Sequence, residues 1–119
     1  MEYVALIYGE EGRWAGLSEE EREREMGEYM ALSGESVTKG GEELDSDATA
    51  TTVRVRGGET LVTDGPFAEL KESIGGYYVF ECDSIEDACT WAAKIPAARH
   101  GAVEVRPVHV DEGDRKSVV

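Results

Sequence analysis

The chain turns at TDGPFAE (residues 63–69), between the apolar pair Leu61-Val62 and the β-type segment GGYYVFE (residues 75–81). Pro66 has no N–H and Gly65 tolerates a positive φ, so the backbone is expected to reverse direction here. The segments before and after this turn therefore decide how the chain folds.

Asp64 stands at the end of the strand that enters this turn, a common position for a functional side chain. Its carboxylate has two interpretations: it bonds its own backbone as a turn former, or it contacts a ligand. Phe67 is apolar enough to pin the turn inward. Before the turn, residues 52–56 alternate apolar and basic side chains, and Gly57-Gly58 fits a tight hairpin turn, after which residues 59–63 return.

A helix is expected on the N-terminal side of this hairpin. Ser18 and Glu21 have the spacing of a capping box, and the pattern predicts a helix over residues 19–38, ended by Gly40-Gly41. Gly27 lies within this helix and suggests close packing against a neighbour. Residues 44–51 are polar and are expected to be an extended lead-in to the hairpin.

Three further elements follow from local patterns. The alternation of side chains over residues 77–82 predicts a strand. Ser84 is the expected N-cap of a second helix, which Pro96 ends. Residues 102–110 are expected to form the last strand. With the apolar segment 2–8 as the first strand, the expected order is β-α-β-β-β-α-β. This order indicates an α+β fold, a ferredoxin-like sandwich with an extra β-hairpin and both helices on one sheet face.

The organisation is that of one domain over residues 1–111, followed by a charged tail over 112–119. Apolar side chains occur on both faces of residues 2–8 and 77–82, although the helices cover one face only. A second copy is the simplest cover for the other face, so we expect a homodimer.

Composition disfavours several kinds of partner. The 119 residues include 26 acidic and 12 basic side chains, a formal charge of −14 that repels nucleic acid and anionic membranes and also favours solubility. There is no signal-peptide or membrane-span pattern, which suggests a cytoplasmic protein. Cys82 and Cys89 are expected to be reduced and unbridged.

Five polar residues are candidates for one site on the sheet. Asp64 is the candidate general base and Tyr29 its hydrogen-bonding partner, while Arg54, Tyr77 and Arg106 are candidates to bind an anionic or polar substrate. The alternatives are that the arginines solvate strand faces and that Tyr29 belongs to the core.

Motifs for metal and cofactor binding are absent from the sequence. His100 and His109 have no Cys or His at ligand spacing, and no glycine-rich phosphate loop or nucleophile signature occurs. We therefore expect neither a metal nor a cofactor.

The stretch TDGPFAE with GGYY resembles the DGPF signature of the YCII-related (YciI-like) domain family. The similarity extends to residues 3–9, 50–54, 91–96 and 104–107, and so covers about residues 1–110. It implies a dimeric α+β barrel. It also implies a catalytic His–Asp pair, of which Asp64 matches the Asp, but the helix from Ser18 to Gly40 contains no histidine.

Two functions of different classes remain open. The first is a small-molecule enzyme or ligand-binding domain with its pocket near Asp64. The second is a non-catalytic regulatory or interaction module, because DGPF members as a group tend to be encoded beside extracytoplasmic-function sigma factors. An ordered pocket favours the first, and a solid core around Asp64 favours the second.

Overall fold

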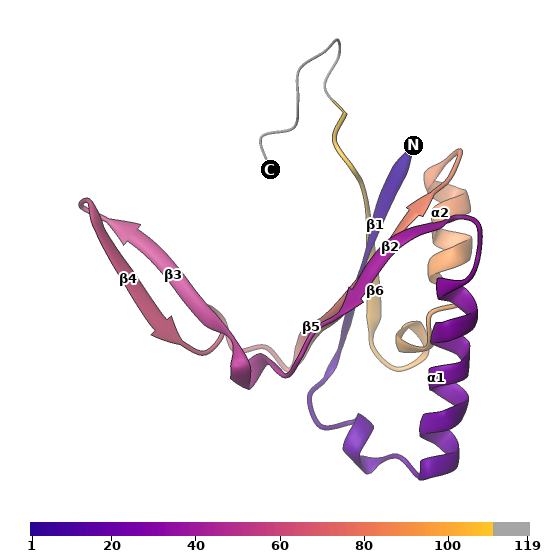
Figure 1. Cartoon of the computed structure of the whole chain (residues 1–119), viewed down its shortest axis with the longest axis horizontal. Helices are drawn as coiled ribbons and strands as arrows, with labels where there is room; N and C mark the ends of the chain where they lie inside the picture. The colour runs from indigo at the N-terminus through magenta and orange to yellow at the C-terminus, as the bar shows by residue number, and fades with distance from the viewer. Residues whose placement is uncertain (111–119) are drawn as a thin grey trace.

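The computed structural model describes residues 1–110 of the chain as an α+β fold built on one antiparallel sheet. Both helices lie on one side of that sheet (Figure 1). The sheet order β2-β5-β1-β6 is compatible with the predicted ferredoxin-like fold, because two split β-α-β units interleave in it. Its elements are β1 (Glu2–Glu10), α1 (Glu19–Ser33), β2 (Thr38–Glu43), β5 (Glu72–Glu81), α2 (Ile85–Ala92) and β6 (Ala102–Pro107), with short 3-10 helices at Trp14–Gly16, Asp47–Thr49 and Pro96–Arg99.

The predicted hairpin forms a separate two-stranded sheet inserted between β2 and β5. Its strands are β3 (Thr51–Arg56) and β4 (Glu59–Asp64), which pair antiparallel around Gly57-Gly58. We call residues 51–64 the arm, because they extend away from the four-stranded sheet on the side opposite the helices (Figure 1).

Both helix starts are confirmed. Ser18 accepts a hydrogen bond from the Glu21 N–H at 3.1 Å, and the Glu21 side chain accepts one from the Ser18 N–H, which completes the capping box. Ser84 caps α2 through the Asp87 N–H at 3.1 Å. The predicted tail over residues 112–119 lies outside the described residues.

The prediction was wrong about residues 34–43. Helix α1 ends at Ser33 with Gly34 as its C-cap, and residues 38–43 form β2, a strand that the sequence analysis assigned partly to the helix. β2 is rich in Gly and Glu, so its own β-propensity is low, and pairing with β5 imposes the extended conformation. The added strand makes the element order β-α-β-β-β-β-α-β. The last strand also ends three residues early, at Pro107.

The Gly75-Gly76 pair lies inside β5 and does not open it, since β5 begins at Glu72. A Cβ on Gly76 would stand 2.8 Å from the backbone oxygen of Glu42. β2 therefore approaches β5 more closely than a side chain at this position allows.

We expect Gly76→Ala to lower the free energy of unfolding by about 1–3 kcal/mol, because a backbone oxygen has to move. The matched control is Gly27→Ala in α1, where a Cβ meets nothing within 4 Å, contrary to the close packing predicted there. That change is expected to stabilise the chain by about 0.5–1 kcal/mol. Urea unfolding of both variants measures the difference, and equal effects would contradict the close approach of β2 to β5.

The core lies between the helices and the sheet. Phe80 and Ala5 are fully buried on the helix-facing side, next to Tyr3, Tyr78 and Leu32. The register places alternate residues on the other side of the sheet, which neither helix covers (Figure 1). We call this side the open face, and its half-buried apolar residues are Val4, Leu6, Tyr8, Tyr77 and Val79.

Within residues 1–110, no helix is long and apolar enough to cross a bilayer. Cys82 is buried and Cys89 exposed, and neither forms a disulfide, which confirms the prediction for this pair.

Candidate functional site

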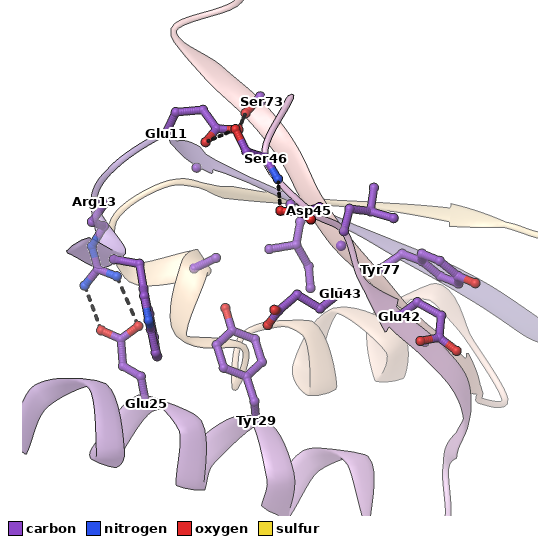
Figure 2. Close-up of a pocket in the computed structure, with 18 of the residues that line it drawn as sticks. Glu11, Arg13, Glu25, Tyr29, Glu42, Glu43, Asp45, Ser46, Ser73 and Tyr77 are labelled. Atoms are coloured by element: carbon purple, nitrogen blue, oxygen red, sulfur yellow. Dashed lines mark hydrogen bonds and ion pairs between the residues drawn. The ribbon is translucent and has the colours of Figure 1, made fainter. Parts of the chain in front are cut away.

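A cleft of about 690 Å³ lies between α1, the segment after β1, and the adjoining ends of β2 and β5 (Figure 2). It is positioned by the fold because β1 leads directly into α1 across one end of the sheet. The lining includes the apolar residues Trp14, Met26, Met30 and Leu44 and the polar residues Arg13, Glu25, Tyr29, Glu43 and His100.

An ion pair between Arg13 and Glu25 forms one wall of this cleft (Figure 2). The two guanidinium nitrogens of Arg13 donate to the two carboxylate oxygens of Glu25 at 3.0 and 2.7 Å. Glu25 is 8% exposed and is the one buried charged residue in the described part of the chain. The hydrogen bonds from Arg13 lower the pKa of Glu25, and Glu25 in turn raises the pKa of Arg13. The pair fixes the segment after β1 against α1.

Tyr29 projects its phenol from α1 into the cleft (Figure 2). Burial raises the pKa of this phenol, so at neutral pH it is a protonated donor and not a base. Its backbone oxygen accepts a hydrogen bond from the Tyr78 hydroxyl at 2.9 Å, which ties the helix to β5. His100 also lines the cleft, where burial lowers its pKa and the nearby charge of Arg13 adds to the effect.

The rim of the cleft is acidic. Glu10, Glu42, Glu43 and Asp45 line it together with Glu11. Neither Glu43 nor Asp45 has a cationic partner within residues 1–110, whereas the side chain of Glu42, which pairs in register with Tyr77, points away from the cleft (Figure 2). An anionic ligand is therefore disfavoured here, in contrast to the anionic or polar substrate considered from the sequence.

Glu11 connects the rim to the base of the arm. Its carboxylate accepts hydrogen bonds from the Asp47 N–H at 2.8 Å and the Ser73 hydroxyl at 3.3 Å, and the first of these lowers its pKa. Three segments that are far apart in sequence are held together by this one side chain. No group of three or more His, Cys, Asp or Glu suited to a metal ion occurs in the part of the chain described here.

The five residues predicted for one site lie in three places. Tyr29 and Tyr77 both line the cleft, but the ring of Tyr77 points away from it toward the open face (Figure 2). Arg106 pairs with Val4 in register on that same face. Arg54 and Asp64 are both on the arm but on opposite faces. Asp64 pairs with Thr51 and therefore shares its face, and Arg54, three positions after Thr51 on the same strand, points to the other face. One copy of the chain does not bring the five together.

The turn after Asp64 is held by backbone groups. Gly65, with φ at +98°, donates its N–H to the Ala50 oxygen at 2.7 Å, and Thr52 donates its hydroxyl to the Gly65 oxygen at 2.8 Å. Among the described residues no donor bonds the exposed Asp64 carboxylate, so the turn does not depend on it. Phe67 is 78% exposed and does not pin the turn inward within one chain, contrary to the prediction.

Sequence reasoning did not find Arg13, Glu25 or His100. Glu25 precedes Tyr29 by four residues, which places both on one side of α1, so helical spacing alone offered a signal for the carboxylate. Nothing in the sequence indicated that Arg13 folds back onto it, since that contact depends on the path of the segment before α1.

These features define a small antiparallel α+β domain with a cleft beside its first helix. The sequence profile of the YCII-related domain family matches residues 1–110, and the chain belongs to this family. It is 37% identical over 114 residues to an uncharacterised protein of Rhizobium meliloti (strain 1021), with 91% of this chain and 92% of that protein covered.

Proposed function

We propose that this protein binds a small molecule in the cleft beside α1. The cleft's volume of about 690 Å³ carries this proposal, because it lies in the range of small-molecule sites and combines an apolar lining with a few convergent polar groups. Binding is better supported than catalysis, since a protonated Tyr29 phenol and a closed Arg13–Glu25 pair orient a ligand but provide no free base.

The ligand that fits this cleft is neutral or cationic. The unpaired carboxylates of Glu43 and Asp45 attract a cation or accept hydrogen bonds, and the Tyr29 hydroxyl donates one. Trp14 and Met26 offer apolar contact for the remainder of the molecule. A compact amine with an apolar body satisfies all of these groups.

A homodimer is part of this proposal. The open face carries half-buried apolar side chains that neither helix covers, and a second copy is the partner that is always present. A non-catalytic interaction module is the second candidate, favoured by the exposed apolar residues of the arm. The association with a sigma factor rests on the sequence resemblance alone.

We also propose a subgroup within the family and a cellular location, each from a single observation. The residues Asp64-Gly65-Pro66-Phe67 support placement in the DGPF subgroup of the YCII-related family. The unbridged Cys82 and Cys89 support a cytoplasmic location, where thiols stay reduced.

The cleft is tested by thermal shift with amines, neutral polar compounds and carboxylates, on the wild type and Tyr29→Phe. An amine or neutral compound present at 100 times its Kd is expected to stabilise the wild type by about 2.7 kcal/mol, and Tyr29→Phe by clearly less. Tyr8→Phe is the matched control, because it removes a phenol hydroxyl outside the cleft lining.

Two results of this screen would overturn the cleft as the site. One is that every compound shifts wild type and Tyr29→Phe equally. The other is a compound whose effect survives Tyr29→Phe but is lost in Asp64→Asn, which would move the site to the turn. Asp64→Asn is suited to this comparison because Asn also favours turns and the backbone bonds around Gly65 remain.

A further inference from the structure

The arm has one apolar face that this chain leaves uncovered. The register pairs Val53 with Val62, Val55 with Thr60 and Thr51 with Asp64, so these side chains share one face of the hairpin. Val53, Val55 and Val62 are 60%, 59% and 64% exposed. A two-stranded hairpin is marginal by itself in water, and its valines gain little unless something covers them. We call this side the valine face of the arm.

The open face of the sheet is the matching surface on the same molecule. Val4, Leu6 and Val79 lie on it with Tyr77, and neither helix covers them. Arg106 lies on it beside Val4, and its guanidinium contacts Glu104 at 3.0 Å on the exposed surface. Exposed ion pairs of this kind are weak, so Arg106 remains able to bind a second carboxylate.

The two surfaces match in apolar character and also offer one pair of opposite charges, Asp64 and Arg106. The valine face ends in the carboxylate of Asp64, which no described donor bonds, and the open face carries the guanidinium of Arg106. The open face also carries the carboxylates of Glu42 and Glu104, which pair in register with Tyr77 and Leu6, so Asp64 fits this face only next to Arg106. The arm is neutral overall, with Arg54 and Arg56 balancing Glu59 and Asp64. Placing it on a second copy of a chain with charge −14 therefore adds no net repulsion.

The position of the arm allows two copies of the chain to exchange arms, so that each arm packs on the sheet of the other copy. The arm extends on the side of the open face, opposite the helices (Figure 1). Strands of six residues span about 20 Å, whereas four strands span about 15 Å, so one arm is long enough to cross a second copy's sheet. A two-fold axis then places each arm on the other copy.

We propose that the arm of each copy packs its valine face on the open face of a second copy, and that Asp64 then acts in trans beside Arg106 and Tyr77 of that copy. This rests on the proposed homodimer. It reunites three of the five residues that the sequence suggested for one site. The composite site needs both copies, because within one chain Asp64 stands on the arm and the other two residues on the sheet.

Neighbouring residues on opposite arm faces test the packing. Val62→Asp is expected to weaken the dimer at least tenfold, because it places a carboxylate in the apolar contact. Leu61→Asp is the matched control on the other face, where it lies beside Arg54, and it is expected to leave the dimer intact. Sedimentation over a range of micromolar concentrations measures the dissociation constant of each.

Charge reversal tests the trans contact. Asp64→Arg and Arg106→Asp are each expected to weaken their own homodimer, since Arg faces Arg in the first and Asp faces Asp in the second. Mixed together they are expected to form a heterodimer in preference to either homodimer, because every contact is then between opposite charges. Native mass spectrometry with one chain carrying a mass tag measures the three species.

Each outcome of these experiments tests a different part of the proposal. A wild type that stays monomeric overturns both the homodimer and the exchange, but leaves ligand binding in the cleft untouched. A dimer that survives Val62→Asp overturns the exchange alone. A mixture with no preference for the heterodimer overturns the contact between Asp64 and Arg106.

Discussion

Replacing Phe80 with alanine is expected to lower the free energy of unfolding by about 4 kcal/mol. Phe80 is 0% exposed, stacks on Tyr78 with ring centroids 5.6 Å apart, and lies near the C-terminal end of β5 on the side that faces the helices. The loss combines the transfer of a large apolar side chain to water with the cavity left between sheet and helices. A loss of this size is a large fraction of the stability of a small domain.

Urea unfolding at a fixed protein concentration measures this loss. Phe67→Ala is the matched control, because the same atoms are removed from a side chain that is 78% exposed, and a change within about 0.5 kcal/mol is expected. A cost below 1 kcal/mol for Phe80→Ala would contradict the core described for the helix-facing side of the sheet. A large cost for Phe67→Ala would instead indicate that a second copy covers Phe67.

The second large effect is expected at the cleft wall. Arg13→Met removes both hydrogen bonds to Glu25 and leaves a carboxylate that is 8% exposed without its partner, at a cost of about 2–3 kcal/mol at pH 7. Methionine retains much of the volume of the arginine stem, so the loss reports the charge and not a cavity. The pair Arg99–Glu28 has the same two-bond geometry in a more exposed place. Arg99→Met is therefore expected to cost less than about 1 kcal/mol.

The cost of Arg13→Met is expected to depend on pH. In the wild type, Arg13 holds the pKa of Glu25 below its ordinary value of 4.5, so the unfolded chain takes up this proton first as the pH falls. The stability that the pair contributes is thus fully present above pH 4.5 and is lost as the pH falls through the lowered pKa. In Arg13→Met burial becomes the largest influence on Glu25 and raises its pKa, against smaller opposite effects of His100 and Arg99, so protonation costs the variant less stability than it costs the wild type.

Urea unfolding of wild type and Arg13→Met at pH 7 and below pH 4.5 measures this difference. The gap between the two proteins should narrow at the lower pH. A gap that stays constant would mean that Glu25 keeps the same proton in both proteins, which would contradict the ion pair as the source of the stability.

The elements with strong local signals were predictable from the sequence. Ser18 with Glu21 and Ser84 with Asp87 fixed both helix starts, because a cap depends on residues within one turn. Gly57-Gly58 and the alternation around it identified the arm, since a hairpin's register follows from its own turn. The α+β class followed from the order of these elements, and the DGPF stretch indicated the family that the sequence profile confirmed.

Strand β2 and the cleft could not be predicted from local sequence patterns. Residues 38–43 carry two glycines and two glutamates, and they are extended only because β5 pairs with them. Tyr29 was identified from its place on α1, but Arg13 and His100, which line the same cleft, belong to segments on either side of that helix in the sequence.

What the sequence by itself determined is therefore the set of local elements, their order and the family. Only the tertiary structure decided that Asp64 and Arg54 lie on opposite arm faces, that Tyr77 and Arg106 share the open face, and that Glu25 is buried against Arg13. The physical reason is one of range. Caps, turns and alternation act between residues a few positions apart, whereas a site is made by packing that brings distant segments into contact, and no single segment encodes its partner.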